Sequence, residues 1–288
     1  MDLCNEKDIR ALLGRHGFRF SKSMGQNFLI DPQIPADIAA SSGADGQCGV
    51  LEIGPGIGPL TAELAQRAGK VVAVELDRAL LPVLAETMAP YPNVEVVPGD
   101  VLKLDLTAIA AEKFQGLTPI VCANLPYNVT SPILEKLVES PCFTAFTVMI
   151  QREVARRLCA PQGSSEGGSF SLFLQYYMKP ELLFDVPPEK FLPAPKVTSA
   201  VIRCVRRERP AVDVADEGFF FKVMRGGFLL RRKTLANSLS AALPGIPKES
   251  IQQAIADMGL PAAVRGEQLT LEDFAALSAA LGREADGD

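Results

Sequence analysis

The feature that most constrains the fold of this chain is a regular alternation of short apolar segments and amphipathic segments. The apolar segments have the length of buried strands and lie at residues 49–54, 70–76, 93–100, 119–127 and 143–151. Segments with helical spacing follow them at 59–69, 78–89, 106–114, 131–140 and 152–160. Strands joined by helical crossovers form a mostly parallel sheet that is covered on both faces. The sequence therefore predicts an α/β fold, and such sheets bind ligands beyond the carboxyl ends of their strands.

The last part of the chain has a different character. A glycine- and serine-rich segment at 163–169 is typical of a flexible loop, and a helix passing into a strand is expected at 170–186. A proline-rich loop then leads into a strand that ends near residue 205. Three helical stretches without strands follow, at 217–243, 248–260 and 270–282. We therefore expect an α/β domain over residues 1–204 and a small all-helical domain over 205–288.

The overall composition excludes several classes of protein. The 288 residues are 48% hydrophobic and 22% charged, which is typical of a globular domain. No apolar run approaches the roughly 20 residues of a membrane-spanning helix, and the first residues have no apolar core typical of a signal peptide. A cytoplasmic protein with no membrane partner is expected. The six cysteines are scattered and His16 is the single histidine, so neither a metal site nor a histidine-based hydrolase is expected.

Charge is distributed unevenly along the chain. The formal net charge is −5, whereas the segment from Arg203 to Lys233 contains nine basic and four acidic residues, a net charge of +5. A basic region on an acidic body suits a protein that presents one face to a polyanion. A charged face that only contacts solvent fits the count equally well.

A glycine-rich turn follows the first predicted strand. Gly54, Gly56 and Gly58 allow a tight turn and a close approach of the backbone to a ligand. The dinucleotide fingerprint G-x-G-x-x-G requires a third glycine where this chain has Pro59, which disfavours NAD. Glu75 ends the next strand, at a position where an acid binds ribose hydroxyls. The turn therefore predicts a ribose-bearing cofactor other than NAD.

The third predicted strand ends in an acidic residue as well. Asp100 can accept a hydrogen bond from the exocyclic amine of adenine, and Val101 beside it can flank the ring. Together with Glu75 for the ribose, these residues describe an adenosine pocket. S-adenosylmethionine (AdoMet) is an adenosine cofactor that needs no phosphate cradle.

The fourth predicted strand ends in Asn124-Leu125-Pro126-Tyr127. Proline ends sheet pairing because it has no backbone N–H group, and a plain turn would favour glycine or aspartate where this chain has tyrosine. An amide, a proline and a phenol ring at the end of a strand indicate a binding site.

With these blocks in order, the chain resembles the ribosomal RNA adenine dimethyltransferases of the small-subunit KsgA/RsmA type. The matching blocks cover nearly the whole chain and are GQNFLID (25–31), LEIGPGIGPLT (51–61), VELD (74–77), GDVL (99–102), NLPYNVTSPIL (124–134), QREVARRL (151–158), FLPAPKVTSAVI (191–202) and GFLLRRKTLANSL (227–239). The loop at 163–169 departs from the family, whose members have a shorter and more basic segment there.

The resemblance implies a Rossmann-like class I AdoMet-dependent methyltransferase domain. It implies that the AdoMet pocket is lined by Asn27, Leu29, Gly54, Glu75, Asp100 and Asn124, to which the glycine turn and the third strand add Gly56 and Val101. It also implies that the target adenine is held by Asn124, Leu125, Pro126, Tyr127 and Phe191. The expected reaction dimethylates two adjacent adenines of 16S rRNA in an immature small ribosomal subunit and leaves S-adenosylhomocysteine.

The residues at the end of the fourth strand suit this chemistry. The exocyclic amine of adenine is a weak nucleophile because its lone pair is delocalised into the ring. Two acceptors, the side-chain oxygen of Asn124 and the carbonyl of either Leu125 or Pro126, would draw the nitrogen toward tetrahedral geometry. Tyr127 would stack on the flipped base, and Phe191 would close the other face. No general base is needed for the attack, because the proton leaves after the nitrogen becomes cationic.

The RNA would contact basic side chains that fix its register without reading its sequence. The candidates for these phosphate contacts are Arg152, Arg156, Arg225, Arg231, Arg232 and Lys233. A monomer is expected. Three alternatives stay open: a large-subunit rRNA adenine dimethyltransferase of the antibiotic-resistance type, a non-catalytic ribosome assembly factor that keeps the pocket, and an NAD-dependent oxidoreductase, which the glycine pattern disfavours.

Overall fold

The structure of the protein is a computed structural model that describes residues 1–18 and 27–285. Gly25 and Gln26, the first two residues of the GQNFLID block, lie outside the described residues. The chain forms two compact units, one of Met1–Ala155 with Glu181–Arg206 and one of Arg156–Pro180 with Arg207–Asp288.

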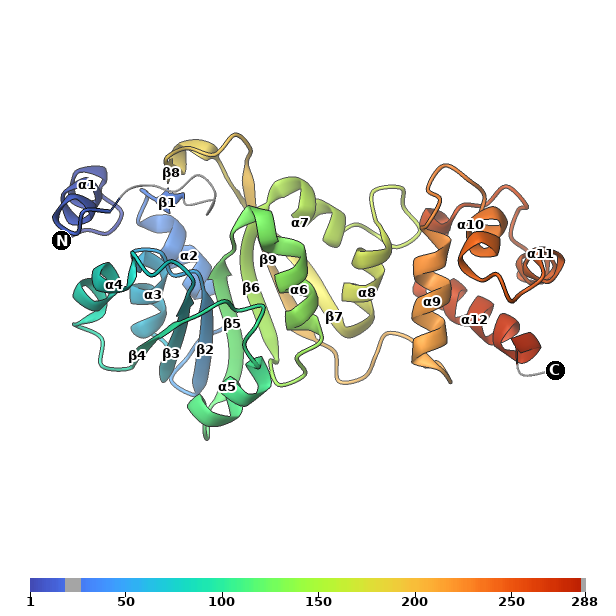
Figure 1. Cartoon of the computed structure of the whole chain (residues 1–288), viewed down its shortest axis with the longest axis horizontal. Coiled ribbons are helices and arrows are strands. Elements are labelled where there is room, and N and C mark those ends of the chain that lie inside the picture. The colour runs from blue at the N-terminus through green and yellow to red at the C-terminus, as the bar shows by residue number, and fades with distance from the viewer. Residues whose placement is uncertain (19–26, 286–288) are drawn as a thin grey trace. The chain divides into compact units, whose positions relative to one another are not determined.

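The first unit is built on a large sheet (Figure 1), whose strand order is β4-β3-β2-β5-β6-β9-β7. The strands are β2 (Cys48–Ile53), β3 (Lys70–Glu75), β4 (Val94–Pro98), β5 (Thr118–Asn124), β6 (Ala145–Gln151), β7 (Met178–Val186) and β9 (Ser199–Arg206). The neighbours from β4 to β6 are parallel, and β9 is antiparallel to β6. The predicted α/β fold with a mostly parallel sheet is confirmed.

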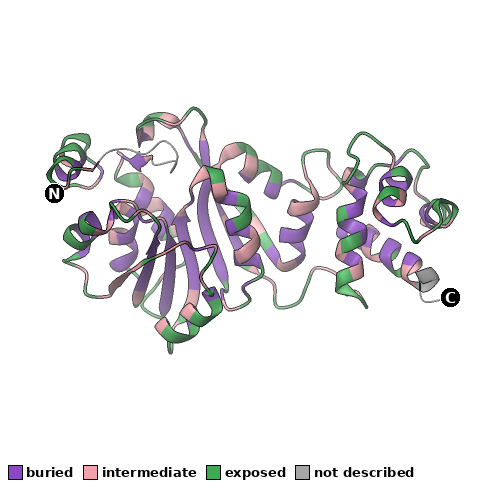
Figure 2. Cartoon of the chain, in the orientation of Figure 1, coloured by how far each residue is buried: buried purple, intermediate pink, exposed green. Residues whose placement is uncertain are grey.

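The strand order reverses at β2, because β3 and β4 extend the sheet on one side of it and β5 and β6 on the other. The connections after β2 and β5 therefore leave in opposite directions, and a crevice opens at the carboxyl ends of these strands. The strand residues themselves are mostly buried, as Figure 2 shows by their purple colour. This arrangement positions the site.

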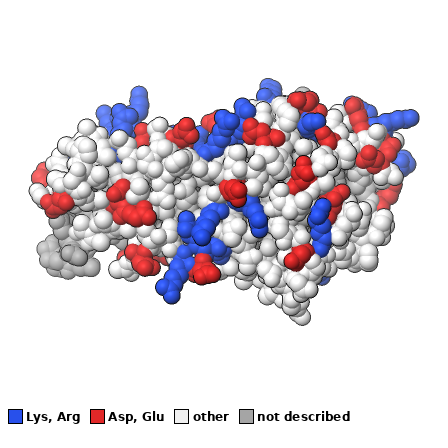
Figure 3. Space-filling model, turned by 180° about the vertical axis from the view of Figure 1, so that it is seen from behind, with Lys and Arg blue, Asp and Glu red and all other residues white. Residues whose placement is uncertain are grey.

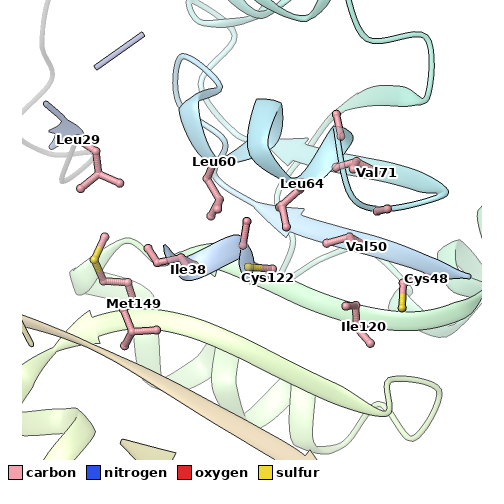
Figure 4. Packing of buried hydrophobic residues seen from close by; sticks show 14 of the residues in the cluster. Leu29, Ile38, Cys48, Val50, Leu60, Leu64, Val71, Ile120, Cys122 and Met149 are labelled. Carbon is pink, nitrogen blue, oxygen red and sulfur yellow. The ribbon is translucent and has the colours of Figure 1, made fainter. Parts of the chain in front are cut away.

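Helices cover both faces of the sheet (Figure 1). They are α2 (Gln33–Ser41), α3 (Pro59–Ala65), α4 (Leu81–Met88), α5 (Leu106–Lys113) and α6 (Thr130–Val138), while α7 (Arg152–Leu158) begins in this unit and continues into the second. The N-terminal helix α1 (Glu6–Arg15) instead packs its Leu12 in one cluster with Val83 of α4. Ile38 of α2 and Leu64 of α3 pack on Val50 and Cys122 of the sheet, as Figure 4 shows. On the opposite face of β2, a Cβ atom at Gly49 would lie 2.3 Å from the ring of Phe114, so the side chain after α5 covers that position.

A short ladder that the sequence does not predict joins two distant segments. β1 (Phe28–Leu29) pairs antiparallel with β8 (Phe191–Leu192). Lys190 donates a hydrogen bond to Asp31 at 2.6 Å next to this ladder, and the resulting ion pair lowers the pKa of Asp31. A two-residue ladder has no periodicity of its own, so only the folded chain reveals that these segments meet.

The second unit contains α8 (Ser169–Tyr177), α9 (Glu217–Gly227), α10 (Leu235–Ala242), α11 (Lys248–Asp257) and α12 (Leu271–Ala285). The prediction of one helical stretch over 217–243 is wrong, because the structure divides it into α9 and α10. The side chain of Thr234 accepts a hydrogen bond from the Asn237 N–H and begins a new helix. The segment 228–234 therefore connects two helices.

The predicted domain boundary at residue 204 stays a prediction. The compact units differ from it in joining residues 156–180 to the C-terminal helices. The reason is aromatic packing, since the ring of Tyr176 lies 5.3 Å from that of Phe220 and 5.0 Å from that of Phe221. The glycine- and serine-rich loop belongs to this unit, where the backbone N–H of Leu271 donates to the side chain of Gln162. No helix within the described residues is long and apolar enough to cross a membrane.

Candidate active site

A cavity of about 220 Å³ opens at the carboxyl ends of β2, β3, β4 and β5. Its lining includes every residue that the sequence predicts for the cofactor and the target base, namely Asn27, Leu29, Gly54, Gly56, Glu75, Asp100, Val101, Asn124, Leu125, Pro126, Tyr127 and Phe191. The roles of these residues stay a prediction. Their convergence follows from the fold, because the carboxyl ends of neighbouring parallel strands lie along one edge of a sheet.

The turn after β2 requires its glycines. Gly54, Gly56 and Gly58 have φ angles of 69°, 64° and 93°, in the left-handed region that favours glycine. A Cβ atom at Gly58 would also lie 2.5 Å from the side chain of Met88. The turn therefore brings bare backbone to the wall of the cavity.

The acids after β3 and β4 are held by backbone N–H groups. Glu75 is 6% exposed and accepts hydrogen bonds from Gly56 at 3.2 Å and from Asp77 at 2.7 Å. Burial raises the pKa of Glu75, and the two backbone bonds oppose that rise. Asp100 accepts a hydrogen bond from the Leu102 N–H at 3.0 Å. Both carboxylates thus have fixed orientations at the cavity.

The two carbonyls that the sequence leaves open differ in the hydrogen bonds that they accept. The carbonyl of Pro126 accepts from the Thr130 hydroxyl at 3.0 Å and from the Val129 N–H at 3.3 Å, at the start of α6. Among the described residues, nothing donates to the carbonyl of Leu125 or to the side-chain oxygen of Asn124. The geometry therefore favours Leu125 over Pro126 as the main-chain acceptor.

Two aromatic side chains reach the cavity from different elements. Phe191 of β8 is 3% exposed. Tyr127, in the 3₁₀ turn Tyr127–Val129, is partly exposed, and its hydroxyl lies 2.5 Å from that of Ser199. Burial raises the pKa of Tyr127, so its phenol is neutral at physiological pH.

Sequence reasoning missed Glu52 of β2, which also lines the cavity. It is 1% exposed, and its Oε2 atom has no hydrogen-bond partner within the described residues. Burial, with a smaller contribution from the charge of Glu75, raises the pKa of Glu52 to about 8. The signal that could have revealed it is an acid inside an apolar strand, because buried carboxylates are rare unless paired.

The cavity suits a cation. Four acidic side chains line it, those of Glu52, Glu75, Asp77 and Asp100, and no lysine or arginine does so among the described residues. AdoMet carries a positively charged sulfonium and ammonium group, which an acidic lining without cations fits, whereas a pyrophosphate would be repelled. This disfavours a dinucleotide. No cluster of three or more potential metal ligands occurs in the described part of the chain.

The cations predicted to contact RNA lie in different surroundings. Arg152 belongs to the first unit and forms an ion pair with Asp185 at 3.5 Å. In the second unit Arg156 of α7 is exposed, and exposed Arg225 of α9 lies 5.7 Å from the centre of the Phe173 ring. Arg231, Arg232 and Lys233 are all exposed in the connection between α9 and α10.

The basic stretch from Arg203 to Lys233 contains fewer exposed cations than its charge suggests. Arg206 donates to the carbonyls of Leu137, Val138 and Ser140 at the end of α6. Arg207 donates to the carbonyl of Gln175 at 3.0 Å. Figure 3 shows basic and acidic side chains interspersed on the face that it displays. The cations of this stretch therefore do not all contribute to one basic face.

The switch in strand order, the glycine turn after β2 and the acid at the end of β3 define a Rossmann-like fold of the class I methyltransferases. The chain matches the family model for ribosomal RNA adenine dimethylase over residues 17–279. It is 46% identical over 284 residues to proteins of Bacillus mycoides and Bacillus cereus named "Ribosomal RNA small subunit methyltransferase A", with 97% of each chain covered.

Among solved structures, the 23S rRNA methyltransferase ErmE is similar with a TM-score of 0.67 and 27% identity, over 89% of this chain and 100% of that one. A dimethyladenosine transferase from Plasmodium falciparum shares the fold, with a TM-score of 0.75 and 24% identity over 89% and 98% of the two chains. The chain belongs to the ribosomal RNA adenine dimethylase family, an AdoMet-dependent family of methyltransferases. The predicted family and fold class are confirmed.

Proposed function

We propose that the protein transfers methyl groups from AdoMet to the exocyclic amines of two adjacent adenines in a loop of 16S rRNA, during maturation of the small ribosomal subunit. The observation that carries the proposal is the end of β5. There the side chain of Asn124 and the carbonyl of Leu125 are two acceptors without other described partners, and they lie in the same cavity as the predicted cofactor residues. The names of the 46% identical relatives support the choice of the small subunit.

The chain's own residues would hold AdoMet along the edge of the sheet. The glycine turn would approach it with bare backbone, Glu75 would accept from the ribose hydroxyls, and Asp100 would accept from the adenine amine. Asn27, Leu29 and Val101 would pack around it. When bound, AdoMet supplies an activated methyl group next to the end of β5.

The acceptors at the end of β5 would orient the target amine. Asn124 and Leu125 would each accept one of its two hydrogens, so that the nitrogen lone pair points toward the methyl group. Positioning of this kind can supply about 7–11 kcal/mol of the barrier reduction. Asn124 can also accept the remaining hydrogen of a monomethylated amine, which permits a second transfer. The proton of the product nitrogen leaves to solvent after transfer.

The flipped base would lie between Tyr127 and Phe191. Stacking on an aromatic ring contributes about 1–3 kcal/mol per base and offsets the unstacking of the target adenine. The exposed cations Arg156, Arg225 and Arg231–Lys233, together with Arg152, would contact phosphates. In this proposal residues 1–204 bind the cofactor and the base, and residues 205–288, together with Arg152 and Arg156, contact the ribosomal RNA. A cytoplasmic location, a monomer and the absence of a membrane partner stay predictions.

Methylation of purified ribosomal subunits tests the proposal. Small and large subunits that lack adenine dimethylation would be incubated with the protein and isotopically labelled AdoMet. Digestion and mass spectrometry would then locate the label. We expect dimethyladenosine at two adjacent positions of 16S rRNA. Label in the large-subunit rRNA alone would favour the antibiotic-resistance type, and no label in either subunit would favour a non-catalytic assembly factor.

A further inference from the structure

The Tyr127 side chain is held at its far end by a residue from another part of the chain. Its hydroxyl and that of Ser199 lie 2.5 Å apart, and either oxygen can donate the hydrogen bond. Ser199 is fully buried, whereas Tyr127 is partly exposed at the cavity. The bond joins two residues that are 72 positions apart in the sequence. A buried hydroxyl needs a partner, and the phenol provides it.

Both ends of this link rest on ordered backbone. Ser199 begins β9 and pairs with Gln151 of β6. At the other end, Pro126 precedes Tyr127, and the Thr130 hydroxyl donates to the carbonyl of Pro126 at 3.0 Å. Two torsions separate the Tyr127 backbone from its ring. A hydrogen bond at the hydroxyl fixes the direction of the ring axis, and it restricts rotation about that axis through the preference of the phenol O–H for the ring plane.

We propose that Ser199 is a positioning residue, whose hydroxyl fixes the position of the Tyr127 ring so that the stacking face for the target base is in place before the RNA arrives. This inference rests on the proposed function, in which Tyr127 stacks on the flipped adenine. A ring that is already ordered loses less conformational freedom when the base binds, and the amine then meets Asn124 in the productive geometry. Ser199 touches neither the base nor the cofactor in this scheme.

The segment from Phe191 to Ser199 would then contribute two residues with different roles to the same site. Phe191 lines the cavity directly, on the ladder with β1. Ser199 acts at the other wall through Tyr127. Residues at the two ends of one segment would thereby set the separation of the two aromatic faces.

Four variants test this inference: Ser199→Ala, Tyr127→Phe, the double variant and Tyr127→Ala. Tyr127→Phe keeps the stacking face and removes the link, whereas Tyr127→Ala removes both. Single-turnover methyl transfer to small subunits gives the rate, and titration of the subunits gives KM. The fluorescence of a 2-aminopurine at the target position reports stacking. AdoMet affinity and thermal unfolding are measured on each variant as controls.

We expect Ser199→Ala and Tyr127→Phe each to lower the transfer rate about 3- to 10-fold, as for loss of one hydrogen bond. The double variant should be no slower than the slower single variant, because both changes remove the same link. KM for the subunits and AdoMet affinity should change less than about twofold. If Ser199→Ala folds poorly, Tyr127→Phe tests the same link from the other side.

The outcomes separate the inference from the proposed function. Wild-type rates for Ser199→Ala and Tyr127→Phe, with a large loss for Tyr127→Ala, would overturn the role of Ser199 and leave the stacking role of Tyr127 intact. Additive losses in the double variant would overturn it too. A wild-type rate for Tyr127→Ala would instead overturn stacking on Tyr127 and the proposed base site with it.

Discussion

The cavity residues and the predicted RNA-contacting cations differ in how the fold constrains them. In the cavity, Glu75, Asp100 and Leu125 each have a backbone hydrogen bond that fixes their place at the end of a strand. In the connection between α9 and α10, Arg231 and Lys233 are exposed. A reaction that depends on exact geometry needs residues that the backbone holds in place. Contacts to a phosphate backbone can be made by exposed side chains without such constraints. The two regions should therefore respond to substitution in different ways.

The largest effect is expected at Asn124. Asn124→Ala removes one of the two proposed acceptors for the amine, and we expect methyl transfer to fall about 10²- to 10³-fold, the range seen when a preorganised polar group of an active site is removed. Asn124→Asp keeps an acceptor oxygen and should retain more activity than Asn124→Ala. The rates are measured by transfer of labelled methyl groups to small subunits.

The control for this change is Gln115→Ala, which removes an exposed amide that precedes β5, at the end of the strand opposite to Asn124 and outside the cavity lining. It should leave the transfer rate within about threefold of wild type, because an exposed side chain fixes no geometry. Equal losses at Asn124 and Gln115 would mean that the carboxyl end of β5 has no special place in the reaction.

A smaller effect, on RNA binding and not on the methyl-transfer step, is expected in the connection between α9 and α10, here called the basic connection. Reversing the charge at Arg231, Arg232 and Lys233 should weaken binding of the small-subunit RNA about 10- to 100-fold at low salt and reduce the salt dependence of binding by about two to three phosphate contacts. AdoMet affinity should not change. Filter binding across a salt series measures both quantities.

Lys248→Glu provides a comparison in the same unit, since Lys248 is an exposed cation at the start of α11. An acid at a helix N-terminus is favourable, so this variant should fold well. Its RNA affinity should fall less than that of Arg231→Glu, which reverses a single charge in the basic connection. The same loss in both would show that net charge alone, and not the connection between α9 and α10, governs binding.

The smallest effect is expected from the protonation of Glu52. Its pKa of about 8 means that it holds a proton at neutral pH, and a bound cation would lower that pKa. AdoMet binding should therefore release a proton, and affinity should rise with pH and level off above about 8. The other groups that face Glu52 are the Thr61 side chain, Glu75 and the buried thiol of Cys122.

Calorimetry across this pH range compares wild type with Glu52→Gln, which is neutral throughout. The ratio of the two AdoMet affinities should change by up to about tenfold, and the proton that AdoMet itself gains or loses cancels in the ratio. A ratio that is independent of pH would show that Glu52 does not respond to the cofactor.

The sequence predicts the fold and the place of the site because strand ends are local features. Asn124, Glu75 and Asp100 each follow an apolar run, and parallel strands bring such ends together. The ladder between Phe28 and Leu192 is different, since it depends on a contact between distant segments.

The exposure of two leucines and the contacts of one arginine could not be predicted from the local sequence either. Leu229 and Leu230 continue the helical spacing after α9, yet they are 57% and 39% exposed in a connection between helices. Arg206 counts as a surface charge in the sequence, yet it binds the carbonyl groups at the end of α6. Apolar periodicity and charge counts do not reveal which side chains the tertiary structure covers.

A structure of the protein with a non-reactive AdoMet analogue and an adenosine-containing oligonucleotide from the 16S loop tests the central claim most directly. We expect the exocyclic nitrogen of the target adenine within about 2.7–3.2 Å of both Asn124 Oδ1 and the Leu125 carbonyl oxygen. A target base whose amine points away from both oxygens, in a complex that is otherwise competent to react, would contradict the account.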